Sequence, residues 1–171
     1  MRPTSNRVRE ALFDILGARV QGSRFLDLFA GTGAVGIEAL SRGAARCLFI
    51  ETDSRLARCI RENLANCELQ GSAEVVQGSL PFCLRSLPEN LLFDLAFLDP
   101  PYEGPHAKRL LEEVDWQRWL LPGAWLILEH ASRGSLGFPT GGLRHLRTAR
   151  YGDSALSFFD ATGAVSPVAK K

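Results

Sequence analysis

A glycine-rich turn between an apolar strand and a helix most constrains the fold of this chain. Three glycines, Gly31, Gly33 and Gly36, follow the short apolar segment 25–29 and open a helical pattern. Glycine permits backbone dihedrals that other residues avoid, and the first N–H groups of a helix have no partner inside it. The Gly-x-Gly-x-x-Gly spacing therefore indicates a strand, turn and helix that can hold a nucleotide-like ligand, although a tight crossing without a ligand can use the same residues.

Strand and helix patterns alternate along most of the remaining sequence. The apolar segments expected as strands are 25–29, 46–51, 74–77, 93–98 and 124–129. The helices are expected at 5–16, after the glycine-rich turn 31–36 and up to Gly43, from Asp53 onward, at 81–87 and near 106–116. Segments 143–151 and 154–160 are joined by a tight turn at Gly152 and Asp153, which predicts an antiparallel hairpin. Strands that are apolar throughout imply helices on both faces, so we expect an α/β fold with a seven-stranded, mostly parallel, doubly wound sheet.

Composition limits the size and class of the protein. At roughly 100 to 200 residues per domain, we expect one domain over 1–162 and a short tail at 163–171. The chain is 46% hydrophobic and 23% charged, as globular proteins are. Twenty Lys and Arg residues against nineteen Asp and Glu give a net charge of +1, which excludes binding of nucleic acid by bulk charge alone. A nucleic-acid partner must therefore meet local basic patches.

The sequence offers no membrane, disulfide or metal pattern. No apolar run approaches the ~20 residues that span a bilayer, and the N-terminus lacks a secretory signal, so we expect a cytoplasmic protein. We also expect a monomer. His106 and His145 lack a partner set, so no metal site is assigned. We expect the cysteines to be reduced and mostly buried, since none are closely paired: Cys47, Cys59, Cys67 and Cys83.

Two acidic residues near the glycine turn bear on the identity of the ligand. Glu51 ends the next strand, where its carboxylate can accept both hydroxyls of a ribose or can simply be solvated. Asp27 precedes the turn, where it would repel a pyrophosphate but suit the ammonium of a methionine moiety. Its alternative role is to cap a local turn. This pair favours S-adenosylmethionine over a nicotinamide dinucleotide, which stays as an alternative.

The segment Asp99-Pro100-Pro101-Tyr102 directly follows the apolar segment 93–98 and so lies where open α/β folds bind ligands. An exocyclic amine of a base is a poor nucleophile, and the Asp99 carboxylate and Pro100 carbonyl can orient it toward a methyl donor. Pro101 fixes that carbonyl, and Tyr102 offers an aromatic face to a base removed from its stack. The pattern predicts methyl transfer to a base amine, and its alternative is a stiff turn covering the core edge.

These motifs resemble those of class I S-adenosylmethionine-dependent amino methyltransferases, which have a Rossmann-like fold. Segments 2–13, 27–42 and 151–158 together resemble the bacterial small-subunit rRNA guanine-N2 methyltransferase family. The resemblance covers nearly the whole chain. It implies transfer of a methyl group to the N2 of one guanine in 16S rRNA, within an assembling small ribosomal subunit.

The motifs and the resemblance together assign candidate site residues. The cofactor-binding candidates are Asp27, Phe29, Gly31, Gly33, Glu51 and Ser79. The catalytic candidates are Asp99, Pro100 and Tyr102. The candidates for contact with substrate RNA are Arg2, Arg7, Arg9 and Pro101.

The sequence departs from the family pattern in two places. Family members usually begin with a basic β-hairpin ahead of the Arg-Pro-Thr segment, whereas this chain opens at Arg2. Gly78 and Ser79 stand where an Asp or Asn commonly meets the adenine amine, which leaves that contact to a hydroxyl or the backbone. A second group of arginines with no acid between them can form a phosphate-contacting patch or a solvated face: Arg133, Arg144, Arg147 and Arg150.

The leading hypothesis is therefore an rRNA guanine-N2 methyltransferase. One alternative is a DNA adenine-N6 or cytosine-N4 methyltransferase, which shares the Asp-Pro-Pro-Tyr motif but generally needs a target-recognition region of domain size. A second alternative is a non-catalytic RNA-binding module with the same fold. Two observations distinguish these three hypotheses: whether the protein binds S-adenosylmethionine, and which nucleic acid accepts the methyl group.

Overall fold

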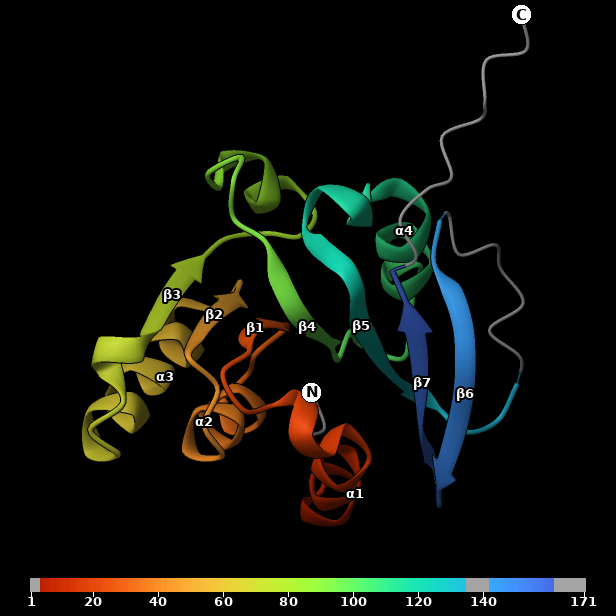
Figure 1. Ribbon diagram of the computed structural model, residues 1–171, viewed down its shortest axis with the longest axis horizontal. Coiled ribbons are helices and arrows are strands. Elements are labelled where there is room, and N and C mark those ends of the chain that lie inside the picture. The colour runs from red at the N-terminus through yellow and green to blue at the C-terminus, as the bar shows by residue number, and fades with distance from the viewer. Residues whose placement is uncertain (1–3, 135–141, 162–171) are drawn as a thin grey trace, which may run out of the picture.

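The computed structural model describes residues 4–134 and 142–161 and contains one seven-stranded sheet (Figure 1). The strand order is β3-β2-β1-β4-β5-β7-β6, with β1 to β5 parallel to one another and β7 and β6 antiparallel. The strands are β1 Arg24–Leu28, β2 Arg46–Glu51, β3 Ala73–Gln77, β4 Phe93–Leu98, β5 Leu120–Ala131, β6 Arg144–Tyr151 and β7 Ser154–Asp160. The predicted α/β sheet with its antiparallel C-terminal hairpin is confirmed.

Helices cover both faces of this sheet (Figure 1). One face packs against α1 Asn6–Leu16, α2 Ala34–Ser41 and α3 Ser54–Asn66, and the other against α4 His106–Glu113. Short 3₁₀ helices lie at Gly17–Arg19, Gln70–Ser72, Phe82–Ser86 and Trp116–Arg118. Two apolar cores result, one on each side of the sheet, because successive side chains of a strand point to opposite faces.

Helix ends follow the chemistry of their capping residues. The Ser5 hydroxyl accepts a hydrogen bond from the Val8 N–H at the start of α1, and Gly17 ends that helix with a positive φ. The Asp53 carboxylate accepts from the Arg55 and Leu56 N–H groups at the start of α3. Both caps satisfy N–H groups that the first turn of a helix leaves without a partner.

Three predicted elements differ in extent or kind. Strand β5 begins at Leu120, not at 124, and the register between β4 and β5 shifts next to Phe93. Pro122 and Gly123 indicated a turn, but they lie within this irregular start of β5. The helix expected to reach residue 116 ends at Glu113, and the predicted helix at 81–87 is a 3₁₀ helix.

The cysteines are free, as expected, but they are not mostly buried. Only Cys47 is buried among them, whereas Cys59 and Cys83 are half-buried and Cys67 is exposed. The helical spacing places Cys67 at the C-cap of α3, beyond the residues of that helix that face the sheet. The expectation therefore failed because burial was inferred from residue type instead of position.

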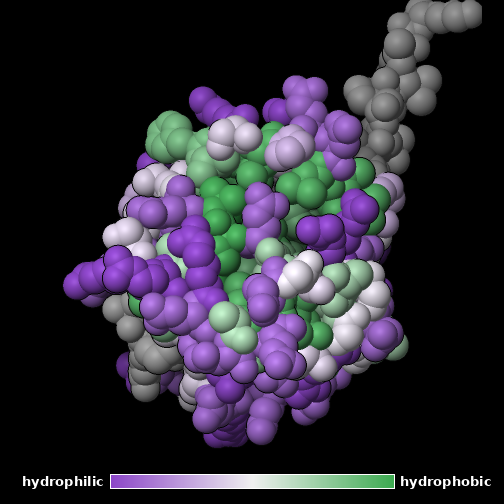
Figure 2. All heavy atoms as spheres, turned by 90° about the vertical axis from the view of Figure 1, so that its left-hand side faces the viewer, coloured by the Kyte–Doolittle hydropathy of each residue, from purple (hydrophilic) through white to green (hydrophobic). Residues whose placement is uncertain are grey.

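The sheet ends on one side at β3, which carries half-buried and exposed residues along its length. Figure 2 views the molecule from this side and shows apolar surface framed by polar residues. In the described part of the chain, none of the helices has the length and apolar character needed to cross a membrane. The predicted tail 163–171 lies outside the described residues.

Candidate methyl-transfer site

Four acidic residues lie in a row near the carboxyl ends of four adjacent parallel strands. Glu51 ends β2, Asp27 lies near the end of β1, Asp99 follows β4, and Glu129 lies near the end of β5. The residues two positions before them all pack in the core on the side of α1, α2 and α3: Phe25, Phe49, Phe97 and Ile127. The four carboxylates therefore belong to the same face of the sheet, and three of them are almost fully buried: Asp27, Glu51 and Glu129.

Gly31 and Gly33 shape the turn between β1 and α2. Both have positive φ angles, 59° and 83°, and Gly33 is the N-cap of α2. These conformations disfavour a side chain, as the motif predicts. Phe29 also has a positive φ, 60°, so the left-handed backbone begins before the glycines.

Gly36 allows α2 to approach β2 closely. A Cβ atom at this position would lie 2.3 Å from Phe49 Cε1 and 2.7 Å from Cys47 Sγ. The third glycine of the motif therefore serves helix–sheet packing, while the first two shape the turn.

Asp27 is buried beneath the turn, with its Oδ2 accepting a hydrogen bond of 2.9 Å from the Gly36 N–H. Burial raises the pKa of this carboxyl well above its ordinary value, and the charges of Asp99 and Glu51 raise it further. The hydrogen bond from Gly36 opposes this shift. Asp27 thus caps local backbone and also lines the cavity described below.

Glu51 connects β2 to the glycine turn. Its Oε2 accepts a hydrogen bond of 2.7 Å from the Gly31 N–H, and its Oε1 accepts one of 3.0 Å from the Asp53 N–H. The carboxylate is therefore held by backbone on both oxygens, beside the turn where the sequence predicts a ribose.

A cavity of about 200 Å³ opens between the glycine turn and the end of β4. Its lining residues are Thr4, Asp27, Phe29, Ala30, Gly31, Thr32, Ala34, Val35, Leu56, Phe97 and Asp99. Among these described residues, the ionisable side chains are the acids Asp27 and Asp99. Acidic groups without a basic neighbour in the lining suit a cationic ligand with an apolar body and are unfavourable for a pyrophosphate. The lining therefore fits S-adenosylmethionine and argues against the nicotinamide alternative.

Three predicted cofactor residues stand apart from this lining. Gly33 lies between the lining residues Thr32 and Ala34 and shapes the turn without facing the cavity, and Glu51 reaches the site through its hydrogen bond to Gly31. Ser79 is exposed, and its backbone carbonyl accepts a hydrogen bond from the Cys83 N–H. The structure does not bring the Ser79 hydroxyl to the cavity.

Asp99 lies at the cavity wall with its carboxylate mostly buried. Burial and the charge of Glu129 raise its pKa to about 7, and a hydrogen bond from Thr4 opposes the shift. Pro100 is buried, whereas Pro101 and Tyr102 are exposed, with 46% of Tyr102 accessible. The four-residue motif thus has a buried half and a half at the surface.

Tyr102 is linked to the C-terminal hairpin. Its hydroxyl lies 2.8 Å from Ser154 Oγ at the start of β7 and donates a longer hydrogen bond of 3.5 Å to Glu129 Oε1. Burial raises the pKa of the Tyr102 hydroxyl. The ring therefore stands at the surface with its hydroxyl anchored.

Three residues of this cluster were not assigned from the sequence: Thr4, Glu129 and Ser154. The Thr4 hydroxyl donates to Glu129 Oε2 at 2.7 Å and also contacts Asp99 Oδ2 at 3.2 Å. Its position could have indicated Glu129, because Glu129 stands near the end of a parallel strand, as the other three acids do.

The predicted RNA-contacting arginines have different surroundings. Arg2 lies outside the described residues, Arg7 is exposed, and Arg9 donates a hydrogen bond to Asn6 Oδ1. In the second group, Arg144 pairs with Asp160 at 2.8 Å, and Arg150 donates to the Ser132 carbonyl. Strand β6 carries Arg144, Arg147 and Arg150 along the edge of the sheet opposite β3.

Comparisons with known proteins place the chain in a family. A family model described as Conserved hypothetical protein 95 matches residues 1–160. The Bacillus subtilis protein YlbH is 34% identical over 163 residues, which cover 95% of this chain and 89% of the relative. The Escherichia coli protein named Ribosomal RNA small subunit methyltransferase D is 35% identical over 142 residues, 82% of this chain and 68% of the relative. The solved structure of Escherichia coli yhhF matches with a TM-score of 0.82 and 29% identity, covering 96% of this chain and 89% of that one.

Proposed function

The chain belongs to the family described as Conserved hypothetical protein 95, and from that membership we propose that it is an S-adenosylmethionine-dependent rRNA methyltransferase. Its acceptor is the exocyclic N2 amine of a guanine in small-subunit rRNA. The observation that carries this proposal is the position of Asp99, in the wall of the cavity beside the glycine turn and three residues from the exposed ring of Tyr102. An amine held at Asp99 would face whatever fills the cavity.

The cofactor is held by the acidic and apolar lining. Asp27 would hold its ammonium, Glu51 and the backbone of the glycine turn would hold its ribose, and Leu56 with Val35 would offer apolar contacts to its adenine. When bound, S-adenosylmethionine supplies a methyl group on a sulfonium, which is already an activated donor. The protein therefore has to orient the acceptor more than activate it.

The acceptor amine is oriented by the Asp-Pro-Pro-Tyr segment. The Asp99 carboxylate and the Pro100 carbonyl each accept one N–H of the amine, so that the nitrogen lone pair points toward the methyl group. Tyr102 stacks on the base, an interaction worth about 1 to 3 kcal/mol. Its bond to Ser154 holds the ring at the surface where a base leaving the RNA arrives.

The proposal extends to the setting of the reaction. The substrate is 16S rRNA within an assembling small ribosomal subunit, the enzyme acts as a monomer, and it works in the cytoplasm, where such subunits form. The arginines of α1 and β6 supply contacts to phosphates. The name of the Escherichia coli relative supports the rRNA substrate.

The proposal is tested by Asp99→Ala. We expect loss of methyl transfer to small subunits from a strain lacking the enzyme, with S-adenosylmethionine binding retained, because the cavity keeps its other lining residues. Tritiated methyl incorporation and calorimetric titration measure the two properties. Transfer at the wild-type rate by the variant would exclude the assigned role of Asp99.

The same assay with duplex DNA in place of small subunits separates the DNA alternative. Mass spectrometry of the methylated nucleoside distinguishes N2-methylguanine from methylated adenine or cytosine. A wild-type protein that binds S-adenosylmethionine but methylates neither substrate would favour the non-catalytic RNA-binding alternative.

A further inference from the structure

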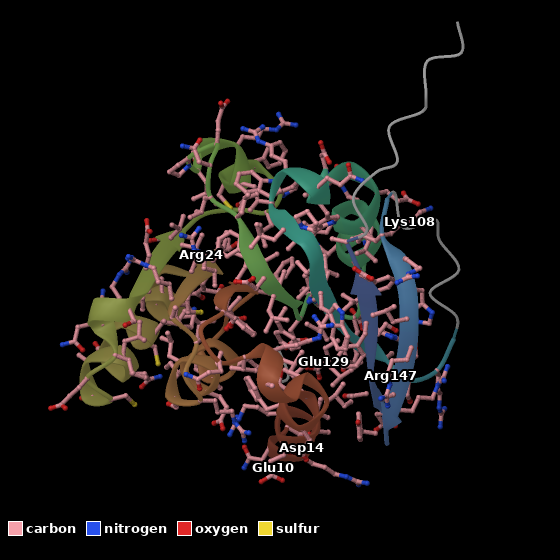
Figure 3. All side chains as sticks on the ribbon, viewed as in Figure 1. Glu10, Asp14, Arg24, Lys108, Glu129 and Arg147 are labelled. Carbon is pink, nitrogen blue, oxygen red and sulfur yellow. The ribbon has the colours of Figure 1, made fainter. Side chains whose placement is uncertain are left out.

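Glu129 is a buried carboxylate directly beside Asp99. The pairing of Leu98 with Leu128 in β4 and β5 places Asp99 and Glu129 at the same level on neighbouring parallel strands. Only 3% of Glu129 is accessible, and it forms no salt bridge within the described residues. Figure 3 shows it at the end of β5 near the start of α1, whereas Glu10 and Asp14 lie at the outer side of α1. Burying a carboxylate without a cationic partner is unfavourable, so the presence of Glu129 here needs an explanation other than a salt bridge.

A single hydroxyl joins the two carboxylates. Thr4 Oγ1 lies 2.7 Å from Glu129 Oε2 and 3.2 Å from Asp99 Oδ2. A threonine hydroxyl has one proton to donate and two lone pairs. When that proton is donated to the nearer oxygen, on Glu129, the donation to Asp99 that opposes its raised pKa is lost, and the hydroxyl can interact favourably with Asp99 only as an acceptor. The arrangement then suits an ionised Glu129 beside a protonated Asp99.

Among the residues that the structure describes, the other groups that face the pair add no positive charge. Tyr102, from the loop after β4, offers its hydroxyl to Glu129 at 3.5 Å. Asp27, on β1, is itself a buried acid whose pKa is raised by burial and by the charge of Asp99, so it brings no cation to the pair. Burial raises the pKa of Glu129, whereas the hydrogen bonds from Thr4, Tyr102 and Ser154 favour its ionised form.

We propose that Glu129 is a positioning residue of this site: held by Thr4, it increases the proton affinity of Asp99, so that Asp99 accepts the proton that the amine loses. This inference rests on the proposed methyl transfer. The raised pKa of Asp99, about 7, agrees with it. A carboxyl with that pKa accepts a proton near neutral pH far better than an ordinary aspartate does.

Methyl transfer leaves the acceptor nitrogen with one proton too many. The nitrogen uses its lone pair to bond the methyl carbon, and the carbon–sulfur bond breaks with its electron pair on sulfur. The extra proton passes to an Asp99 oxygen, and the Thr4 hydroxyl accepts a hydrogen bond from the protonated carboxyl. Release of the proton to solvent after the product leaves restores the ionised Asp99 that receives the next amine.

The experiment compares pH profiles of methyl transfer. Asp99 must be ionised to accept an amine N–H, so kcat/KM of the wild-type protein rises with pH, with a midpoint near 7. Glu129→Gln removes the neighbouring charge and moves that midpoint down by about one pH unit. Glu10→Gln makes the same chemical change at an exposed carboxylate of α1 and leaves the midpoint in place. A purely structural role of Glu129 would lower activity at every pH without moving the midpoint.

A second measurement does not depend on activity. In a ¹³C NMR titration of the wild-type protein, the Asp99 carboxyl carbon, assigned by its loss in Asp99→Asn, titrates near pH 7. Titration at the ordinary value near pH 4, or superimposable profiles of wild type and Glu129→Gln, would overturn the role of Glu129. Absence of methyl transfer by the wild-type protein at every pH would instead contradict the proposed function. The NMR titration would then still test whether Glu129 raises the pKa of Asp99.

Discussion

At the scale of single residues, the site is built from carboxylates that are held out of water. Asp27 is 2% accessible and keeps one hydrogen bond, to the Gly36 N–H. Burial of a carboxylate disfavours its charged form, which is the largest cause of its raised pKa. A charged carboxylate at this buried position destabilises the free protein. A bound cationic ligand would offset that destabilisation.

Asp27→Asn should therefore stabilise the free protein and weaken binding of S-adenosylmethionine. The folded chain binds the Asp27 proton more tightly than the unfolded chain does. The penalty is therefore absent below the ordinary pKa and grows as pH rises toward the raised value. We expect an increase in the free energy of unfolding at pH 8, by about 1.4 kcal/mol per unit of raised pKa, and a smaller increase at pH 5.

Urea unfolding at the two pH values measures this effect, and calorimetry measures ligand binding. Asp14→Asn is the matched control, because Asp14 is exposed on α1. Equal stability changes for the two variants at pH 8 would contradict the assigned burial penalty.

Local motifs identified some functional residues, and tertiary contacts were needed for the others. Asp27 and Asp99 could be predicted because they stand at a strand end next to a glycine turn or a proline pair, and Glu51 because it ends the next strand, twenty residues beyond Gly31. Glu129 ends an apolar run without such a neighbour, and its partner Thr4 is 125 residues away. No spacing rule connects residues so distant, and only the folding of α1 over the ends of β4 and β5 brings them together.

At the scale of elements, close packing of α2 on β2 fixes the glycine turn over the cavity. Gly36 has no room for a side chain, because Phe49 and Cys47 occupy the place of its Cβ. Both neighbours are buried, Phe49 completely, so neither can move toward solvent. The turn therefore depends on a core contact whose residues, Gly36, Phe49 and Cys47, are not among those lining the cavity.

Gly36→Ala should destabilise the fold. Alanine favours helix over glycine by about 1 kcal/mol, but overpacking of a core costs roughly 1 to 3 kcal/mol, and here the clash involves a buried ring. The net effect is a loss of stability. Gly71→Ala is the control, because a Cβ there meets nothing within 4 Å. The urea unfolding midpoints of the two variants test this prediction. Equal midpoints would contradict it, because they would show that α2 can shift without loss of stability.

The helices and strands could be predicted from the apolar pattern and the capping residues, whereas their irregular ends could not. Strands β2, β4 and β7 have the predicted bounds, since each is a mainly apolar segment between turn residues. The start of β5 was missed because Pro122 and Gly123 usually interrupt a strand, yet Gly123 here donates to the Ala161 carbonyl. Pairing with a distant segment overrode the local signal.

At the scale of the whole molecule, charge is sorted across the sheet. The central strands carry the four carboxylates, and β6 at one edge carries Arg144, Arg147 and Arg150. A net charge of +1 hides this separation. The Tyr102–Ser154 hydrogen bond joins the two regions, because Ser154 begins the strand that pairs with β6.

Replacing Arg147 and Arg150 by Gln should weaken rRNA binding and its dependence on salt. Removal of one guanidinium–phosphate pair reduces the slope of log K against log salt by about 1. Arg24→Gln is the control, since Arg24 is exposed at the start of β1 and lies away from Arg147 (Figure 3). Binding isotherms at several salt concentrations measure the slopes. An unchanged slope in the double variant would exclude these two arginines as phosphate-binding residues.

Within the part of the chain that the structure describes, β6 is the last strand of the sheet, and its outer row of backbone groups pairs with no further strand. Such an edge is a template on which another chain can add a strand and start an aggregate. The register shift between His145 and Arg147 disturbs that template, and exposed guanidinium groups repel a second copy carrying the same charges. We therefore expect the arginines proposed to contact RNA also to hinder edge-to-edge association of two copies of this chain.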